Sequence, residues 1–405
     1  MLVHGATETP VLPGRKRSFV FAIIATLLLM VAASAPSPFY PRFAEQLDLL
    51  PVAMTLIFAV YAFSMLTALL LAGGLSDIVG RRPVISVGAV LLAVSLLMFW
   101  HGGSLSMLIA ARVVQGLAAG LLLPALSAMV VDSAPSAHSE SASLWNTIAA
   151  MIGLGIGAIS AAIILDVSLN PVGAVFGSVA IVFMLVAGLV WVTPSTLQRS
   201  RMQTARATSR LAVPVHLRRA LRVAAPAIIA GWATNGLFLA LGSSLVQSEF
   251  EPTTHAGQSI AIPVFAVSGI VASVVLHRRS ARVVSLYGTS ALGVGTALSL
   301  GALALQSFPA YLFTVAIVGT GFGTAFMGVL KTLMPRVRPV ERAAVMAVIY
   351  TVSYLAFGVP TIVAGLLVPL LSLQGTMISL GCVIVALCVV ATVQRTRSPE
   401  LSHAT

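Results

Sequence analysis

Two short strings that contain charged, polar and glycine residues stand out in a largely apolar sequence. The first reads GGLSDIVGRRP at positions 73–83, and the second reads RVVQG at positions 112–116. In the first string, Gly80 permits a tight reversal between two helices. Asp77 can bond exposed backbone N–H groups at a helix end, and the two adjacent arginines offer planar donors to a carboxylate on a neighbouring helix. These residue types predict a charge network.

The composition sets the environment in which these strings must work. The chain has 405 residues, of which 58% are hydrophobic and 8% are charged, and its mean hydropathy is +1.03. A soluble domain carries about 25% charged residues, so most of the surface of this chain must face lipid. The net charge of +12 is explained by basic loops beside an anionic leaflet, and we expect no nucleic-acid partner.

Twelve apolar segments are long enough to cross a bilayer, since a crossing helix needs about 20 apolar residues. They occupy positions 19–35, 52–71, 84–100, 105–131, 144–165, 171–192, 223–246, 260–276, 283–305, 310–330, 343–371 and 375–393. The only long polar stretch, 193–222, divides them into six and six. The expected fold is therefore an all-α polytopic membrane protein with twelve transmembrane helices in two pseudo-symmetric six-helix bundles, 1–192 and 223–405, joined by a cytoplasmic linker at 193–222.

The basic residues give the expected orientation. Of the 23 Lys and Arg residues, 21 lie in gaps on one side of the predicted helices, and the exceptions are Arg42 and Arg112. Cytoplasmic loops carry the excess of basic residues, so both termini are expected in the cytoplasm. Only two of the 23 are lysines, which is typical of a GC-rich bacterial genome, and we expect a multi-pass protein of the bacterial inner membrane. A cleavable signal peptide ending near Ala33-Ser34-Ala35 is the alternative for the first segment, which we expect to be retained.

Small residues recur at equivalent places in the two predicted bundles. Because small side chains let helix backbones approach closely in lipid, we expect a set of residues in the fourth, fifth and eleventh segments to pack helices together. The set is Gly116, Gly120, Gly153, Gly157, Gly358 and Pro360. A six-plus-six repeat with such contacts suits two bundles that rock against one another around a central site.

The first string resembles the cytoplasmic loop signature of the major facilitator superfamily, G-x-L-x-D-x-x-G-R-R. The resemblance implies a network that latches the two bundles together when the protein is open to the outside, with a partner acid at the inner end of the fourth segment. In this sequence the implied latch residues are Gly74, Asp77, Gly80, Arg81, Arg82 and Asp132. The alternative is a short solvated loop whose arginines only follow the charge rule. The corresponding loop at 277–282 lacks the Asp and the closing Gly, so we expect no second latch.

The second string resembles the R-x-x-Q-G string of proton-linked facilitator exporters. Arg112 lies eight residues past Ser104, which is about 12 Å along a helix. A lone arginine there costs about 2.5 to 3.5 kcal/mol and should therefore face the bundle interior with a partner. It could hold an anionic or polar substrate group, modulate a nearby proton-carrying acid, be a structural hydrogen-bonded residue, or snorkel to the headgroups.

Two departures from the exporter pattern are visible. The predicted helices carry no acid near mid-membrane, because Glu45, Asp48 and Asp166 fall at outer ends and Asp77 and Asp132 at inner ends. The fifth segment keeps two glycines of the exporters' G-x-x-x-G-P-x-x-G-G string and lacks its proline and second glycine pair.

Polar or aromatic residues on apolar helices are the candidates for substrate contact. They are Tyr40, Tyr61, Arg112, Gln115, Asn146, Asn235, Phe238, Phe322, Phe326, Tyr350 and Tyr354. The resemblance implies that the first, fourth, seventh and tenth helices line the cavity. A lining of aromatic and amide groups with one cation suits a modest-sized organic substrate, neutral or anionic.

These observations predict a secondary transporter that works by alternating access, as a proton-linked antiporter for efflux of a drug or metabolite. Import of a metabolite is the alternative, and a membrane-embedded enzyme a distant one, because the seven histidines are scattered and no acid pair is present. We expect no catalytic residue, metal or cofactor, the proton gradient as driving force, and a monomer whose partners are the lipid bilayer and a small molecule.

Overall fold

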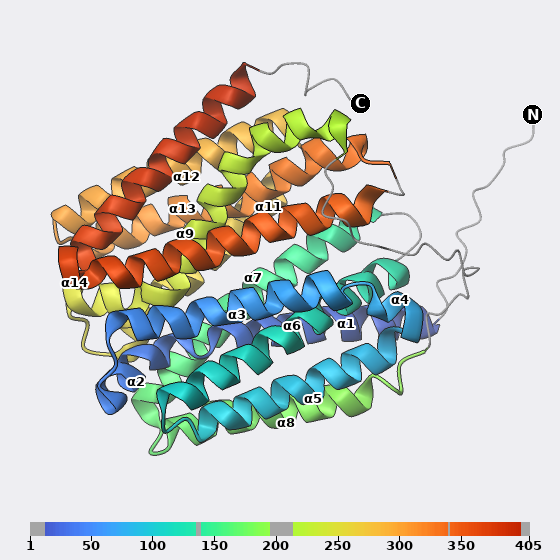
Figure 1. Ribbon diagram of the computed structural model, residues 1–405, viewed down its shortest axis with the longest axis horizontal. Coiled ribbons are helices and arrows are strands. Elements are labelled where there is room, and N and C mark those ends of the chain that lie inside the picture. The colour runs from blue at the N-terminus through green and yellow to red at the C-terminus, as the bar shows by residue number, and fades with distance from the viewer. Residues whose placement is uncertain (1–12, 135–138, 195–213, 339–340, 398–405) are drawn as a thin grey trace, which may run out of the picture.

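The chain folds into helices joined by short connections. We describe residues 13–134, 139–194, 214–338 and 341–397 of a computed structural model (Figure 1). The N-terminal half comprises α1 (Pro13–Ser34), η1 (Ser37–Phe39), α2 (Tyr40–Leu47), α3 (Pro51–Ala72), α4 (Leu75–Val79), α5 (Arg81–Trp100), α6 (Leu105–Ser133), α7 (Ser139–Val167), η2 (Gly173–Gly177) and α8 (Ser178–Leu189). The C-terminal half comprises η3 (Val215–Leu217), α9 (Arg218–Phe250), α10 (His255–Ser259), α11 (Ala261–Leu276), α12 (Ala281–Ala304), α13 (Phe308–Leu333), η4 (Met334–Arg336) and α14 (Arg342–Thr396).

Twelve crossings result, as the sequence predicted. Within the described ranges, ten helices are apolar and long enough to cross a bilayer. One of them, α14, is two crossing helices that meet at Ser372, whose φ of 64° interrupts the helix. The shorter apolar helix Gly173–Leu189 supplies the remaining crossing. The all-α, twelve-helix fold class is therefore confirmed.

Most predicted boundaries shift by a few residues in the structure, and two of these shifts have a clear physical cause. The first crossing helix ends at Ser34 and continues through η1 into the amphipathic helix α2, because the prolines at 36 and 38 remove backbone N–H donors. The seventh begins at Arg218, five residues before the predicted 223, since arginine is a good helix former and its side chain can reach the polar boundary. Most of the predicted linker, 195–213, lies outside the described residues.

The two halves meet along two pairs of helices. α3 packs along α14, and α7 packs along α11. In Figure 1 the blue α3 lies beside the first part of the red-orange α14, while α12 and the second part of α14 run away from the N-terminal half toward the upper right. The pairing places α3, α6, α9 and the first part of α14 around the middle of the molecule.

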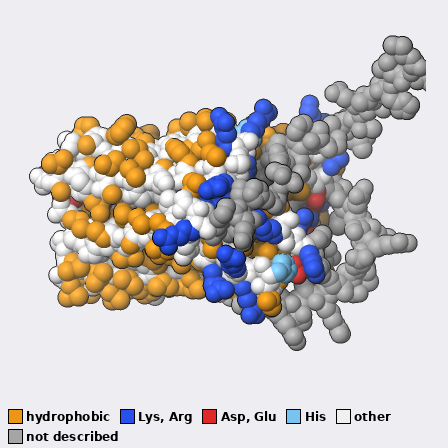
Figure 2. Space-filling model, turned by 90° about the horizontal axis from the view of Figure 1, so that it is seen from above, with side chains coloured by type: hydrophobic (Ala, Val, Ile, Leu, Met, Phe, Trp, Pro, Cys, Tyr) orange, Lys and Arg blue, Asp and Glu red, His pale blue; other side chains and the backbone are white. Residues whose placement is uncertain are grey.

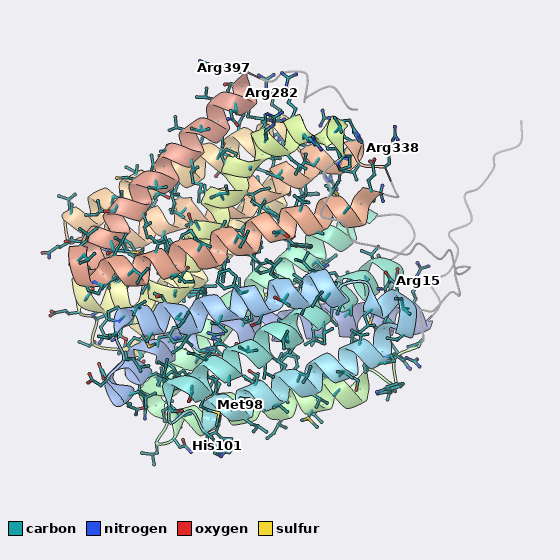
Figure 3. All side chains as sticks on the ribbon, viewed as in Figure 1. Arg15, Met98, His101, Arg282, Arg338 and Arg397 are labelled. Carbon is teal, nitrogen blue, oxygen red and sulfur yellow. The ribbon has the colours of Figure 1, made fainter. Side chains whose placement is uncertain are left out.

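Charge is concentrated at one end of these helices. Figure 2 shows Lys and Arg side chains gathered toward one end and hydrophobic side chains over the remainder of the visible face. Arg15, Arg338, Arg282 and Arg397 mark this end on the two halves, which we call the basic end (Figure 3). Met98 and His101, where α5 finishes, mark the opposite end. The hydrophobic surface between the two ends is the part that a bilayer would cover.

The predicted packing glycines sit where helix backbones come close together. A Cβ added at Gly116 would lie 2.5 Å from the Tyr61 carbonyl oxygen on α3. At Gly120 it would lie 2.5 Å from Ala68 Cβ and 2.7 Å from the Met65 carbonyl oxygen. A side chain at either position would therefore push α6 away from α3.

The other members of the predicted set lie on α7 and α14. Gly153 and Gly157 on α7 meet α1, the latter at 2.5 Å from the Val31 carbonyl oxygen. Gly358 on α14 faces Phe63 of the other half, at 3.2 Å from its Cζ. Pro360 lies inside helix α14.

Replacement of Gly120 by leucine tests this packing. We expect Gly120→Leu to lower the stability of the protein in detergent by about 1–3 kcal/mol, the usual cost of overpacking. The measurement is dye-monitored thermal unfolding of the purified protein. Gly188→Leu is the matched control, because a Cβ at Gly188 has no atom within 4 Å, and an equal loss in both variants would contradict the packing role.

Candidate functional site

Arg112 is the most unusual side chain of the interior. It is fully buried, with a relative exposure of 0%, on α6. Four aromatic rings surround its guanidinium: the Cζ atom lies 5.4 Å from the ring centroid of Tyr40, 5.8 Å from Phe58, 5.5 Å from Tyr61 and 5.3 Å from Phe99. We call these four rings the arginine cage. Rings at such distances attract a cation through their quadrupoles.

Two hydrogen bonds hold the guanidinium inside the cage. Its terminal nitrogens donate to the Gln115 side-chain oxygen and to the Tyr40 hydroxyl. Gln115 in turn donates to the Ala32 carbonyl oxygen of α1 at 2.9 Å. These bonds tie Arg112 of α6 to α2 and, through Gln115, to α1, and the alternative in which it snorkels to the headgroups is wrong. Its Nε has no hydrogen-bond partner among the described residues.

The C-terminal half presents an aromatic surface to the same region. Trp232 of α9 lies at its centre, with ring centroids 5.3 Å from Tyr354, 5.8 Å from Phe326, 6.1 Å from Phe357 and 6.4 Å from Phe322. Tyr350 lies beside Tyr354 at 6.4 Å. We call these six residues the aromatic cluster: Trp232, Phe322, Phe326, Tyr350, Tyr354 and Phe357.

One ring pair joins the cage to the cluster. The rings of Phe58 on α3 and Phe357 on α14 lie 5.0 Å apart, so a single ring separates Arg112 from the other half. Neither phenylalanine was among the predicted contact residues, and Trp232 was not among them either. A signal was available, because Phe58 lies three residues before Tyr61, Phe357 three after Tyr354 and Trp232 three before Asn235, which places each pair on one helix face.

Exposure within the aromatic cluster increases toward the basic end. Tyr354, Phe357 and Phe322 are buried, whereas Trp232, Phe326 and Tyr350 are partly exposed. Tyr350 lies eight residues into α14 from its basic end, and Phe326 seven residues before the end of α13. The accessible part of the aromatic surface is therefore the part nearer the basic end.

The remaining predicted contact residues lie beside this region. Asn235 is buried on α9. Phe238, one turn further, stacks on Phe265 at 5.4 Å, and Phe265 lies 5.1 Å from Phe322. Asn146 is half-buried on α7, and its side-chain oxygen has no hydrogen-bond partner among the described residues.

The residues of the predicted latch form a network at the basic end. Arg81 contacts the Asp77 and Asp132 carboxylates, each at 3.0 Å, and donates to the Ser76 hydroxyl at 3.0 Å. Gly80 takes a φ of 100°, a conformation that favours glycine. A Cβ at Gly74 would meet no atom within 4 Å, so packing does not require glycine there.

This network lies within the N-terminal half. Arg15 of α1 donates to the Asp132 carbonyl oxygen at 3.1 and 3.2 Å, and Arg82 donates to the Thr193 carbonyl oxygen. The C-terminal half has a different contact at the equivalent place. Lys331, near the end of α13, donates to the carbonyl oxygens of His277 and Arg279 in the loop before α12.

The opposite end carries the polar contacts that cross between the halves. Asp166, at the end of α7, accepts from the His255 backbone N–H at 2.9 Å, the Ala256 N–H at 3.0 Å and His255 Nδ1 at 2.7 Å. The Ser37 hydroxyl donates to the Leu239 carbonyl oxygen at 2.9 Å. Among hydrogen bonds and ion pairs between two residues of the described ranges, those joining the halves are all at this end. The structure is thus fastened at the opposite end.

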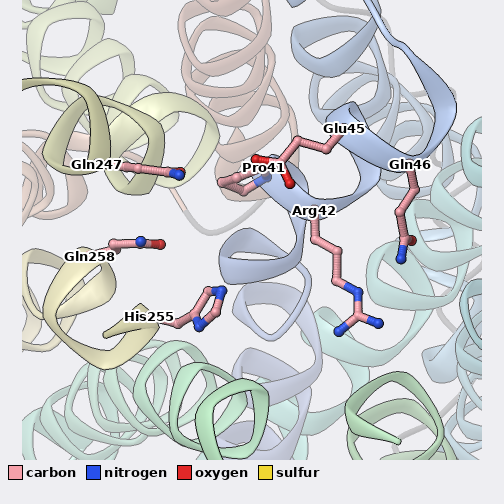
Figure 4. Close-up of a pocket in the computed structure, with 7 residues that line it drawn as sticks. All are labelled: Pro41, Arg42, Glu45, Gln46, Gln247, His255 and Gln258. Carbon is pink, nitrogen blue, oxygen red and sulfur yellow. The ribbon is translucent and has the colours of Figure 1, made fainter. Parts of the chain in front are cut away.

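A polar cavity of about 290 Å³ lies beside this contact. It is bordered by α2 on one side and by α9 and α10 on the other, with Arg42, Glu45, Gln247, Gln258 and His255 around it (Figure 4). Within the described ranges, no group of three or more His, Cys, Asp or Glu side chains could hold a metal ion.

A family profile matches most of this chain, whereas individual known proteins match only shorter stretches of it. The profile of the Major Facilitator Superfamily matches residues 22–359. The quinolone resistance protein NorA of Staphylococcus aureus is 29% identical over 109 residues, which cover 27% of this chain and 28% of NorA. The multidrug resistance protein MdtL of Klebsiella pneumoniae (strain 342) is 36% identical over 80 residues, 20% of each chain. The chain therefore aligns with less than a third of each relative.

Solved structures share the fold. A bacterial homologue of the human lysosomal transporter Spinster, in an inward-facing and unoccupied conformation, superposes with a TM-score of 0.76 over 97% of this chain and 99% of that one. A variant of the nucleoside transporter NupG gives a TM-score of 0.73 over 93% of this chain and 99% of its own. Both are 12% identical to this chain, so they bear on its fold alone.

The contact of Asp166 with α10 can be tested by labelling. In a background in which serine replaces Cys382 and Cys388, Ser37→Cys places a thiol at a site that is 2% exposed at the fastened end. We expect Asp166→Asn to speed its reaction with a membrane-impermeant maleimide about tenfold, because loss of a charged acceptor costs about 1.5–3 kcal/mol. Asp48→Asn, at the same end on the loop after α2, is the control, and equal rates in the two variants would argue against the role of Asp166.

Proposed function

The chain belongs to the major facilitator superfamily, and on that premise we propose that it exports a small organic molecule across the bacterial inner membrane by alternating access. The substrate meets Arg112 and the aromatic cluster between the two halves, and the proton gradient drives its export. The protein acts as a carrier and carries out no chemical conversion, as a monomer.

One observation carries the proposal. The polar contacts between the halves gather at the opposite end, around Asp166 and Ser37, whereas the accessible part of the aromatic cluster lies toward the basic end. A carrier that alternates must close one end while the other gives access to a central site. The contacts at the opposite end and the partial exposure of the cluster toward the basic end support a state that loads from the basic end.

The direction of transport is supported by the relatives and by one sequence string. The partial matches to NorA and MdtL are to proteins named for quinolone and multidrug resistance. The Arg112-x-x-Gln115-Gly116 string is typical of proton-linked exporters, and here its arginine and glutamine are hydrogen-bonded to each other. The alternative is import of a metabolite on the same scaffold.

The orientation follows from charge. Because cytoplasmic loops collect basic residues, the basic end faces the cytoplasm, and both termini lie on that side. In this orientation the partly exposed residues of the aromatic cluster lie nearer the cytoplasmic side, from which an exporter must load its substrate.

A labelling experiment checks the orientation. Ala205→Cys, in the cysteine-free background, is expected to react with an impermeant maleimide in inverted vesicles and to stay unlabelled in intact cells. Labelling from outside in intact cells would reverse the assignment of the two faces.

Transport into inverted membrane vesicles tests the function. With a panel of fluorescent organic compounds, we expect uptake of at least one compound to rise on energisation and to collapse when a protonophore removes the gradient. Uptake into right-side-out vesicles instead would identify an importer.

Asp77→Asn tests the charge network in the same assay. This change removes the carboxylate that Arg81 contacts at 3.0 Å, and we expect the transport rate to fall at least tenfold, about 1.4 kcal/mol in barrier height, with normal insertion. Asp48→Asn serves as the control. Full activity of Asp77→Asn would remove the network from the transport cycle.

A further inference from the structure

Among the residues that the structure describes, the buried charge of Arg112 has no acidic counter-charge. The sequence contains 11 acidic residues, and none falls inside a membrane-crossing stretch. Those with described side chains lie at or beyond helix ends: Glu45, Asp48, Asp77, Asp132, Asp166, Glu249, Glu251 and Glu341. An arginine inside a bilayer protein normally pairs with an acid or with backbone carbonyls. Arg112 instead has four rings, a hydroxyl and an amide oxygen.

Two N–H donors in this region also lack acceptors. Arg112 Nε and Trp232 Nε1 are buried without a hydrogen-bond partner among the described residues. One belongs to the arginine cage of the N-terminal half and the other to the aromatic cluster of the C-terminal half. Buried donors without acceptors are rare and need an explanation, such as a missing ion or ligand. Both N–H groups need a hydrogen-bond acceptor, and the charge beside them is positive.

We propose that the transported molecule is an organic anion with an aromatic body, whose anionic group becomes the counter-ion of Arg112. The inference rests on the proposed function and names its substrate class. The aromatic body stacks on the aromatic cluster, which is partly accessible at Trp232, Phe326 and Tyr350. Because Phe58 lies against both Arg112 and Phe357, rotation of this ring, with Tyr61 beside it, opens the cage to the anionic group.

This assignment also accounts for the missing acid. An exporter of a neutral or cationic compound needs a group that exchanges its charge during the cycle, and the crossing helices supply no carboxylate for that purpose. An anion moves outward down the inside-negative membrane potential, which is the electrical part of the proton gradient, without such a group. Arg112 remains charged throughout and moves with its own half, so each cycle carries out the negative charge of the substrate.

The binding experiment uses a matched pair of probes, 2-naphthoate and 2-naphthamide, which differ mainly in charge. The purified full-length protein, with phenylalanine at positions 100, 145 and 191, retains Trp232 as its single tryptophan. Quenching of its fluorescence reports binding. We expect 2-naphthoate to bind about tenfold or more tightly than 2-naphthamide, as loss of one charged hydrogen-bonded contact predicts.

Variants then assign the preference to Arg112. Arg112→Gln should reduce the ratio of the two affinities to about one, and Arg112→Lys should retain part of it, because lysine keeps the charge but loses the planar donors. Arg42→Gln is the control, since it removes a positive charge at the opposite end. A ratio near one in the native site, a ratio that survives Arg112→Gln, or no binding of 2-naphthoate at millimolar concentration would each overturn the proposal.

A transport experiment separates this inference from the proposed function. Proteoliposomes at equal pH on both faces receive a potassium diffusion potential through valinomycin, and the flux of each labelled probe is measured. We expect the potential to raise the flux of 2-naphthoate toward its positive side and to leave 2-naphthamide unchanged. Asp77-dependent flux that ignores both probe charge and potential would leave the carrier function standing and reject the anion. Arg112-dependent binding without any flux would support the anion as ligand and reject the carrier function.

Discussion

The cost of placing charge in hydrocarbon organises the whole molecule. It keeps basic residues out of the crossing segments, and 21 of the 23 lie in gaps on the side that the positive-inside rule assigns to the cytoplasm. Among the described residues of the N-terminal half, Arg112 is the one basic side chain that is fully buried. Arg112 can stay there because four aromatic rings and two oxygen acceptors replace its water. The cage therefore fixes the positions of α2, α3, α5 and α6 around one guanidinium.

The same constraint explains why the two ends of the molecule differ. At the basic end, the charged groups of each half satisfy one another: Arg81 with Asp132 in one, and Lys331 with loop carbonyls in the other. At the opposite end, Asp166 takes its donors from the other half. Few charged groups are available to join the halves. The end where Asp166 joins them is therefore the end at which the halves are held together. A carrier can change state by exchanging a small number of such contacts.

The fold could be predicted from the sequence because length, apolarity and basic gaps count the crossings directly. What could not be predicted were the contacts that depend on how halves far apart in sequence meet. Tyr61, Arg112 and Tyr354 stood out as polar or aromatic residues on apolar helices. Phe58, Trp232 and Phe357 share helix faces with selected residues, but the contact of Phe58 with both Arg112 and Phe357 depends on how the two halves pack. The Asp166 contact was equally invisible, because no pattern in α7 identifies a donor 89 residues away.

The site is divided between the two halves in a way that bears on coupling. The N-terminal half supplies the charge, and the C-terminal half supplies most of the aromatic surface, with the Phe58–Phe357 pair as the boundary. A ligand that touches only one half would bind equally well whatever the angle between them. A ligand that needs both Arg112 and Trp232 gains its full contact energy only when the halves are close, and binding then shifts the population toward the closed arrangement. The division of the proposed site between the halves therefore gives substrate binding a way to favour the closed arrangement.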